Sequence, residues 1–219
     1  MEEKQTFKLA VLASGNGSNL EAIIDQLHGW PVESGGTAGA DKRTIEVSLV
    51  VCNSPGAKAI ARAREAGIDC VVIPSEGCES LERHDLQMVE AIRQAEADLV
   101  VLAGYMRLLH PSFLDAFPNR VINLHPALLP AFPGTTSIAD AVEYGVKVTG
   151  VTVHYVDEGV DTGCIIAQQP VLVEADDTAD TLAARIHEAE HELLPRVIRM
   201  IAAGKVTPPA AGSRKVRTE

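Results

Sequence analysis

Hydrophobic residues along the first 125 positions follow two periods in turn, one typical of strands and one typical of helices. Continuous apolar runs predict strands at Phe7–Ala13, Glu46–Cys52, Asp69–Ile73, Leu99–Ala103 and Val121–Leu124. Helical spacing predicts helices after Asn19, at Ala57–Ala66 and at Ser80–Ala95. This alternation predicts the α/β class, with a doubly wound, mainly parallel twisted sheet that has helices on both faces. Ligands of such sheets bind beyond the carboxyl ends of the strands.

The second half of the chain departs from this regular alternation. A helix is predicted at Ser137–Tyr144, strands at Thr149–Val156 and Ile165–Val173, and a long amphipathic helix at Thr178–Ala203. Residues 29–44 contain several glycines and little periodicity, so we expect an exposed, mobile loop. We also expect a single domain over residues 1–206 and a disordered tail at residues 207–219.

The strand at Val121–Leu124 runs into the sequence Asn123-Leu124-His125-Pro126. Because side chains alternate across a strand, we expect Asn123 and His125 on one face at its carboxyl end. Pro126 should end the strand, and two further prolines by residue 133 predict a stiff, extended loop. An amide donor beside an imidazole suits acyl transfer, in which an oxyanion forms and a proton moves. A buried Asn beside a satisfied core His explains these residues equally well.

A glycine-rich turn, Ser14-Gly15-Asn16-Gly17-Ser18-Asn19, separates the first strand from the first helix. Gly15 and Gly17 tolerate backbone angles closed to other residues, and Ser18 or Asn19 can cap the helix. Free N–H groups would then gather at the positive end of the helix, where a phosphate binds well. The turn is neither a dinucleotide fingerprint, because Leu20 replaces the third glycine, nor a P-loop. An ordinary strand-to-helix turn without a ligand is the alternative.

Charge and cysteine content narrow the class of function. The 219-residue chain has a formal net charge of −11, which argues against nucleic-acid or anionic-membrane partners. Its four cysteines, Cys52, Cys70, Cys78 and Cys164, form neither a C-x-x-C pair nor a zinc spacing, so we expect reduced thiols in a cytoplasmic protein. Neither a secretion signal nor a long apolar segment is found, so membrane insertion is not expected.

Two segments invite a metal-site interpretation. His187-Glu188-Ala189-Glu190-His191 matches H-E-x-x-H on a predicted helix, but no suitable third ligand follows, and we predict no metal. The acidic segment Asp157–Gly163 lacks the spacing of a calcium loop. Taken alone, this segment fits a solvated hairpin better than a functional loop.

Four motifs together resemble one family. They are Ala13–Asn19, Leu102–Arg107, Asn123–Pro126, and Gly150–His154 leading to Val160–Gly163. From about Phe7 to Gly204, the chain is similar to the folate-dependent phosphoribosylglycinamide formyltransferases of purine synthesis. The resemblance implies a Rossmann-like formyltransferase fold and small-molecule substrates. It also implies transfer of the formyl group of the co-substrate 10-formyltetrahydrofolate to the amine of glycinamide ribonucleotide, without a metal.

The resemblance also implies roles for particular residues. Asn123 would stabilise the oxyanion of a tetrahedral intermediate, His125 would move a proton, and Asp161 would orient His125 and favour its charged form. The ribonucleotide would contact Gly17, Ser18, Asn19, His187, Glu188, Ala189 and Glu190, with Glu190 as the partner of a hydroxyl group. The folate would contact Met106, Arg107, Leu108, Leu109, Asn123, Asp157, Glu158, Gly159, Val160 and Asp161, with Arg83 as a further candidate.

Two departures from the family pattern concern single contacts. Thr135-Thr136-Ser137 stands where many members have a histidine after Pro-Gly, and Leu81 stands where an arginine is expected, with Arg83 nearby. Methionyl-tRNA formyltransferase and formyltetrahydrofolate hydrolase are alternatives with the same chemistry, but each usually has a further domain for which we expect no room here. A non-catalytic protein that binds a phosphate ligand is the alternative from another class. A homodimer stays open.

Overall fold

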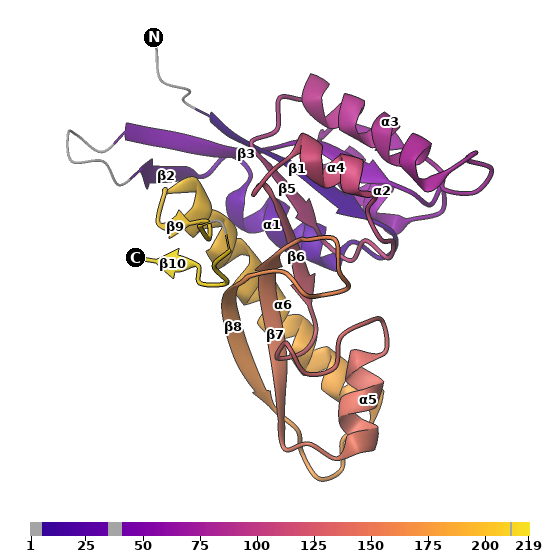
Figure 1. The fold of residues 1–219 in the computed structure, drawn as a ribbon, viewed down its shortest axis with the longest axis vertical. Coiled ribbons are helices and arrows are strands. Elements are labelled where there is room, and N and C mark those ends of the chain that lie inside the picture. Colours follow the sequence, from indigo (N-terminus) through magenta and orange to yellow (C-terminus); the bar gives the residue numbers. More distant parts are fainter. Residues whose placement is uncertain (1–5, 35–40, 211) are drawn as a thin grey trace.

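The computed structural model describes residues 6–34, 41–210 and 212–219. Its main sheet has the order β2-β3-β1-β5-β6-β7-β8, with β4 also paired to β3 (Figure 1). The strands of this sheet are β1 (Thr6–Ala13), β2 (Pro31–Ser34), β3 (Asp41–Cys52), β4 (Cys70–Val72), β5 (Leu99–Leu102), β6 (Val121–His125), β7 (Val148–Tyr155) and β8 (Ile165–Leu172). The helices are α1 (Ser18–Leu27), α2 (Lys58–Glu65), α3 (Leu81–Gln94), α4 (Pro111–Ala116), α5 (Ser137–Tyr144) and α6 (Ala179–Ala202).

The centre of the sheet is parallel and its far edge is antiparallel. β1 pairs in parallel with β3 and β5, and β5 with β6, whereas β7 runs against both β6 and β8. All four residues of β5 are buried, as expected for a parallel strand covered on both faces, while burial alternates along the edge strand β8. The predicted doubly wound, mainly parallel sheet is confirmed.

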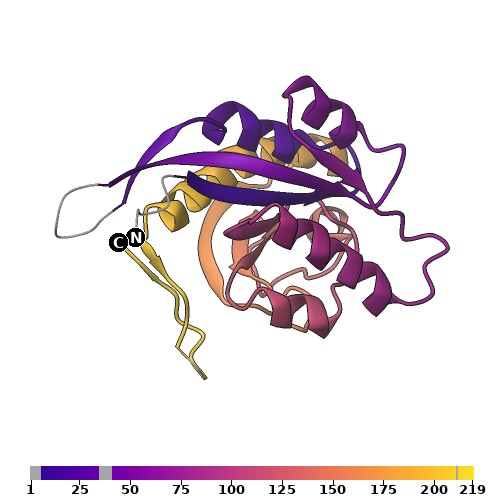
Figure 2. The same ribbon diagram turned by 90° about the horizontal axis from the view of Figure 1, so that it is seen from above.

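Two helix layers cover the two faces of the sheet (Figure 2). Leu9 and Val11 of β1 pack into the cluster that includes α1 and α6, and Ala10 and Leu12 pack into the cluster that includes α3 and α4. The alternation of side chains along a strand therefore assigns each residue to one layer. By the same alternation Asn123 and His125 lie on the face of α3 and α4, because Ile122 and Leu124 belong to the cluster of α1 and α6.

The segment between β7 and β8 folds back over the sheet. β7 ends beside the beginning of β6, where Tyr155 is the partner of Ile122. The backbone N–H of Tyr155 donates to the carbonyl of Cys164 at 2.9 Å and closes the base of the intervening loop. Residues 156–163 therefore return across β6, which brings Asp161 to Asn123 and His125 although 36 or more positions separate them in sequence.

Three parts of the chain differ from the sequence-based expectation. Within the expected loop 29–44, Pro31–Ser34 pairs with Asp41–Thr44 as two antiparallel strands, and residues 35–40 lie outside the described part of the chain. The expectation of a loop is wrong for the paired residues, because their backbone groups hydrogen-bond to each other. Helix α4 was not predicted; it begins with a proline at its first turn, and the His110 side chain caps it by accepting from the Ser112 N–H.

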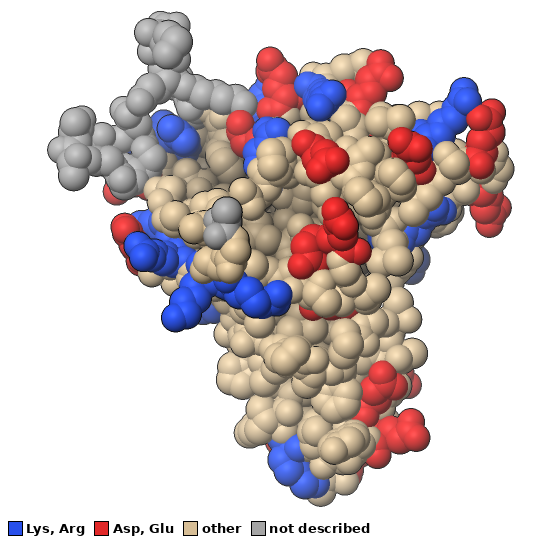
Figure 3. Space-filling view, viewed as in Figure 1, with Lys and Arg blue, Asp and Glu red and all other residues tan. Residues whose placement is uncertain are grey.

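The tail is the third difference. We expected disorder after residue 206, but β9 (Val206–Thr207) pairs with β10 (Arg217–Thr218), and Arg214 Nη2 donates to the Thr162 carbonyl at 2.6 Å. The expectation of a disordered tail is wrong for these residues, because such contacts hold them against the loop that carries Asp161. Lys and Arg side chains gather at this end of the face in Figure 3, in a chain that is acidic as a whole. Among the described residues, no helix is long and apolar enough to cross a membrane.

Gly163 allows the fold-back of the loop, and its replacement tests this geometry. A Cβ at this position would lie 1.6 Å from the Tyr155 carbonyl oxygen, so Gly163→Ala should lower the free energy of unfolding by about 1–3 kcal/mol or more. Gly56→Ala is the matched control, because a Cβ there meets nothing within 4 Å, and its effect should stay within about 0.5 kcal/mol. Urea denaturation measures both, and equal stability of the two variants would contradict the close approach.

Candidate functional site

Two pockets meet at the carboxyl ends of β5 and β6. The first, of about 230 Å³, lies between residues 104–109, the end of β6 and the loop 157–161. The second, of about 810 Å³, lies between the turn 14–19, the start of α5 and the face of α6. Both pockets are lined by Gly104, Met106, Leu124, Pro126 and Thr135. Because they share these walls, ligands in the two pockets would lie next to each other.

Asn123, His125 and Asp161 form a contiguous polar cluster in the first pocket. Asn123 Nδ2 donates to Asp161 Oδ1 at 3.4 Å, and His125 Nδ1 lies 3.4 Å from Asp161 Oδ2. The other ring nitrogen of His125, Nε2, lies 2.8 Å from the carbonyl oxygen of Phe132. Both nitrogens of His125 thus face acceptors, and only a protonated ring donates to both. The 3.4 Å contact is longer than a well-formed charge-assisted hydrogen bond, which leaves Nδ1 accessible to a reacting group.

The Asp161 carboxylate is kept charged by its neighbours. Burial acts to raise the pKa of Asp161, but the imidazole of His154, the N–H of Gly134 and the nearby His125 ring outweigh it, so that this pKa is lowered. The Gly134 N–H donates to Oδ2 at 2.8 Å. Asp161 itself has a φ of 53°, a left-handed conformation that Asp tolerates better than most residues. The loop therefore delivers an ionised carboxylate to the end of β6.

His154 is a site residue that the sequence analysis did not single out. It lies opposite Asn123 in the β6–β7 register and is almost fully buried. His154 Nδ1 lies 2.8 Å from the Tyr155 carbonyl oxygen, which only accepts, so this nitrogen carries a proton. In the neutral ring Nε2 is then an acceptor, and it faces Asn123 Nδ2 at 3.2 Å. His154 thereby fixes the Asn123 amide with its donor group inward. The histidine in the Gly150–His154 motif was the available sequence signal.

The glycine-rich turn forms one end of the second pocket. Helix α1 begins at Ser18, and its N-cap is Gly17, which supplies no side chain to cap the first turn. The expectation that Ser18 or Asn19 caps the helix is therefore wrong. Gly17 is required for another reason as well, because its φ is 76° and a Cβ there would lie 2.8 Å from Ala59 Cβ. The open first turn of α1 leaves backbone donors at the positive end of a helix, which suits an anion.

Glu190 organises the α6 side of the second pocket. This residue is 4% exposed, and its Oε2 accepts from Asn19 Nδ2 at 3.0 Å and lies 2.9 Å from His187 Nδ1. The hydrogen bond to Glu190 outweighs desolvation and raises the pKa of His187. The H-E-x-x-H segment thus forms an internal His–Glu contact at the pocket wall.

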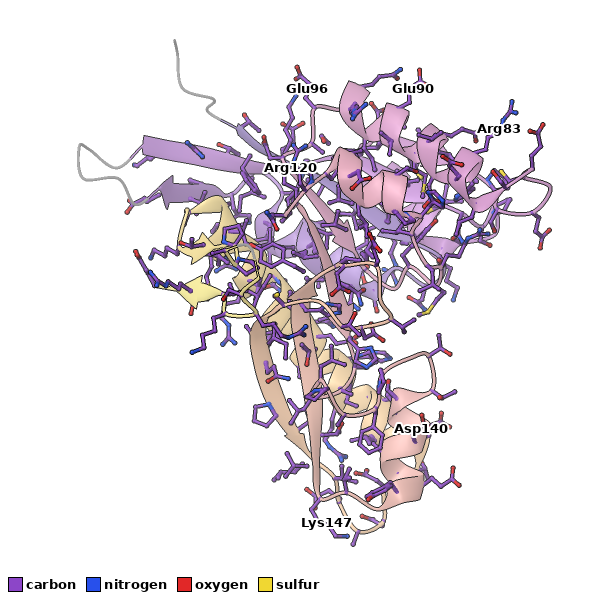
Figure 4. All side chains as sticks on the ribbon, viewed as in Figure 1. Arg83, Glu90, Glu96, Arg120, Asp140 and Lys147 are labelled. Carbon is purple, nitrogen blue, oxygen red and sulfur yellow. The ribbon has the colours of Figure 1, made fainter. Side chains whose placement is uncertain are left out.

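The remaining predicted residues divide between the pocket walls and the surface. The first pocket is lined by Met106, Arg107, Leu108, Leu109, Asp157, Glu158, Gly159 and Val160, and the second by Gly17, Ser18, Asn19, His187 and Glu190. Glu188 and Ala189, next to His187 on α6, line neither pocket. Arg83 also lies away from both pockets, at the outer end of α3, where its guanidinium pairs with Glu79 at 2.5 Å (Figure 4). Thr135, which follows Gly134, faces both pockets.

Comparison with known proteins gives one consistent result. The family model described as formyl transferase matches residues 7–198. A phosphoribosylglycinamide formyltransferase of Bacillus subtilis (strain 168) is 43% identical over 194 residues, which cover 89% of this chain and 94% of that protein. The trifunctional purine biosynthetic protein adenosine-3 of Drosophila melanogaster is 43% identical over 197 residues, and the chain spans 14% of its length. The solved glycinamide ribonucleotide transformylase 1 of Symbiobacterium toebii has a TM-score of 0.86 at 38% identity, covering 98% of this chain and 94% of that one.

The contact between His187 and Glu190 predicts a pH-dependent pair. Because Glu190 raises the pKa of His187, this pKa should lie above the usual value of about 6.5, and Glu190→Gln should lower it. The stabilisation from the pair is fully present below the unfolded pKa and is lost as the pH rises through the folded pKa. NMR titration of His187 in both proteins measures the shift. Glu192→Gln, whose carboxylate contacts Gln169 instead, is the control and should leave the His187 titration unchanged; an identical titration in Glu190→Gln would refute the pair.

Proposed function

This chain belongs to the formyl transferase family, and on that premise we propose how its two pockets divide the work of formyl transfer. Its activity is that of a phosphoribosylglycinamide formyltransferase in purine biosynthesis. In our proposal 10-formyltetrahydrofolate occupies the first pocket and glycinamide ribonucleotide the second. The formyl carbon and the attacking amine then meet where the pockets join.

The observation that carries this proposal is the position of the polar cluster at the junction. Leu124 lines both pockets, and its neighbours Asn123 and His125 line the first. A donor, an imidazole and a carboxylate are therefore available beside the point where the two ligands would touch. Holding two reactants in this way replaces an encounter in solution and removes much of its entropic cost.

In the proposed reaction the amine attacks the formyl carbon directly and forms a tetrahedral intermediate. The Asn123 amide, held by His154, donates to the oxygen that becomes negative. His125 transfers the proton that lets the folate nitrogen leave, and Asp161 orients the ring and favours its charged form. The intermediate then collapses to the formylated amide and tetrahydrofolate. This route requires neither a metal nor a covalent enzyme intermediate.

Binding of the ribonucleotide is proposed to use both ends of the second pocket. The phosphate would lie at the first turn of α1, against the backbone of Gly17, Ser18 and Asn19. A ribose hydroxyl would donate to Glu190 at the opposite wall, with His187 at the mouth of the pocket. The folate would lie against Met106–Leu109 and Asp157–Asp161. Arg83, Glu188 and Ala189 have no part in this arrangement, since they line neither pocket.

A direct assay tests the function. Purified protein with 10-formyltetrahydrofolate and glycinamide ribonucleotide should convert the folate, which is followed by absorbance, and the rate should survive exhaustive chelation of metals. Formyl release without the ribonucleotide would indicate a hydrolase, and no turnover with both substrates a binding protein. Loss of activity on chelation with recovery on adding zinc would contradict the metal-free route.

The positioning role of His154 gives a second test. His154→Phe keeps a ring in the buried space but removes the acceptor that holds the Asn123 amide, so turnover should fall by about 10–1,000-fold, up to the loss typical of an oxyanion donor. The KM values of both substrates should change much less, because the pocket walls stay in place. His154→Gln can present an amide oxygen to Asn123 and should recover part of the rate. Steady-state kinetics on the two variants decide the matter, and a rise in KM with an unchanged kcat would contradict the role.

A further inference from the structure

Two buried polar atoms of the second pocket have no hydrogen-bond partner within the described residues. They are Asn19 Oδ1 and His191 Nε2. Both residues line this pocket, Asn19 at the start of α1 and His191 on α6. Buried polar atoms are nearly always paired in folded proteins, because an unpaired one loses its hydrogen bonds to water without replacement. Two of them in one pocket indicate that a ligand supplies the missing partners.

The orientation of the Asn19 amide is fixed by its neighbour. Asn19 Nδ2 donates to Glu190 Oε2 at 3.0 Å, and a carboxylate only accepts, so the reverse orientation of the amide would place two acceptors together. Asn19 Oδ1 is therefore an acceptor that faces the pocket. His191 follows Glu190 directly on α6, so a carboxylate, an amide oxygen and an imidazole nitrogen stand together on this wall.

These three groups match a vicinal diol. One hydroxyl of a ribose can donate to Glu190, and the neighbouring hydroxyl can donate to Asn19 Oδ1 while it accepts from, or shares a proton with, His191 Nε2. A hydroxyl is the one common ligand group that both donates and accepts at a single oxygen. The phosphate is held by the other end of the pocket in the proposed arrangement, which places the sugar between the turn and α6.

We propose that His191 and the Asn19 side-chain oxygen read one hydroxyl of the ribose and make the enzyme specific for a ribonucleotide over its deoxy analogue. The proposal rests on the assignment of the ribonucleotide to the second pocket. His191 is then a specificity residue for the substrate and takes no part in the chemistry. A site built to hydrogen-bond a hydroxyl discriminates strongly against the analogue that lacks it, because its own polar atoms are left unpaired.

The test combines protein variants with substrate analogues. His191→Phe retains a ring without nitrogen, His191→Gln offers an amide in place of Nε2, and Glu192→Gln is the matched control on the same helix. Each is assayed with glycinamide ribonucleotide and with its 2′-deoxy and 3′-deoxy analogues. Removing the hydroxyl that His191 reads should lower kcat/KM of the wild type by about 10–100-fold. His191→Phe should lose a similar factor with the ribonucleotide but almost nothing further with that analogue, and His191→Gln should recover part of the loss.

Several outcomes would overturn the proposal. Unchanged discrimination in His191→Phe, or equal losses with all three substrates, would show that His191 has only a structural role. Wild-type turnover that ignores both hydroxyls would do the same, whereas absence of wild-type turnover with the ribonucleotide would instead contradict the function itself. A measurement on the unaltered protein avoids any folding defect: the ¹⁵N shift of His191 Nε2 should change when the ribonucleotide binds and should change less with the analogue. Equal shifts would contradict the proposal.

Discussion

The site depends on the placement of one carboxylate, that of Asp161. Its two oxygens contact the side chains of Asn123 and His125 from β6 and the backbone N–H of Gly134 from the proline-rich loop. A buried carboxylate is costly unless hydrogen bonds and nearby positive groups compensate it. These contacts lower the pKa of Asp161 despite its burial, so the pairing is present at neutral pH and is lost as the pH falls through that lowered value.

The same carboxylate connects the fold to the chemistry. The loop that carries Asp161 leaves β7 at the wrong end of β6, and only its return across the sheet brings the charge to the reacting edge. Gly163 permits that return, and the tail supports it through the contact of Arg214 with Thr162. Across β6, His154 orients the amide of Asn123, so that the donor and the imidazole are held by different neighbours of one loop. The second pocket adds the other substrate without disturbing this arrangement.

Much of this could be predicted from the sequence, and the reasons are local. The strands and helices around residues 7–125 follow from periodicity, and Asn123 with His125 follows from alternation on a short strand that ends at a proline. Asp161 came only from resemblance to a family, since a Gly-punctuated acidic segment equally describes a hairpin. The partner strands β2 and β10 could not be predicted, because their stability comes from pairing with distant segments rather than from their own pattern. His154 was missed because its role lies in a cross-strand contact. Arg83 was drawn into the site by sequence proximity alone, and its side chain turns to Glu79.

The central claim is that Asp161 and His125 act as one unit in the transfer step. The most direct measurement is kcat for Asp161→Asn, for His125→Gln and for the double variant, under saturating concentrations of both substrates. Each single change should lower kcat by orders of magnitude, in the range of ~10²–10⁴-fold typical of general acid–base assistance. Because groups that work together are not additive, the double variant should lose far less than the product of the two single losses. A loss equal to that product would show that the two residues act independently and would contradict the account.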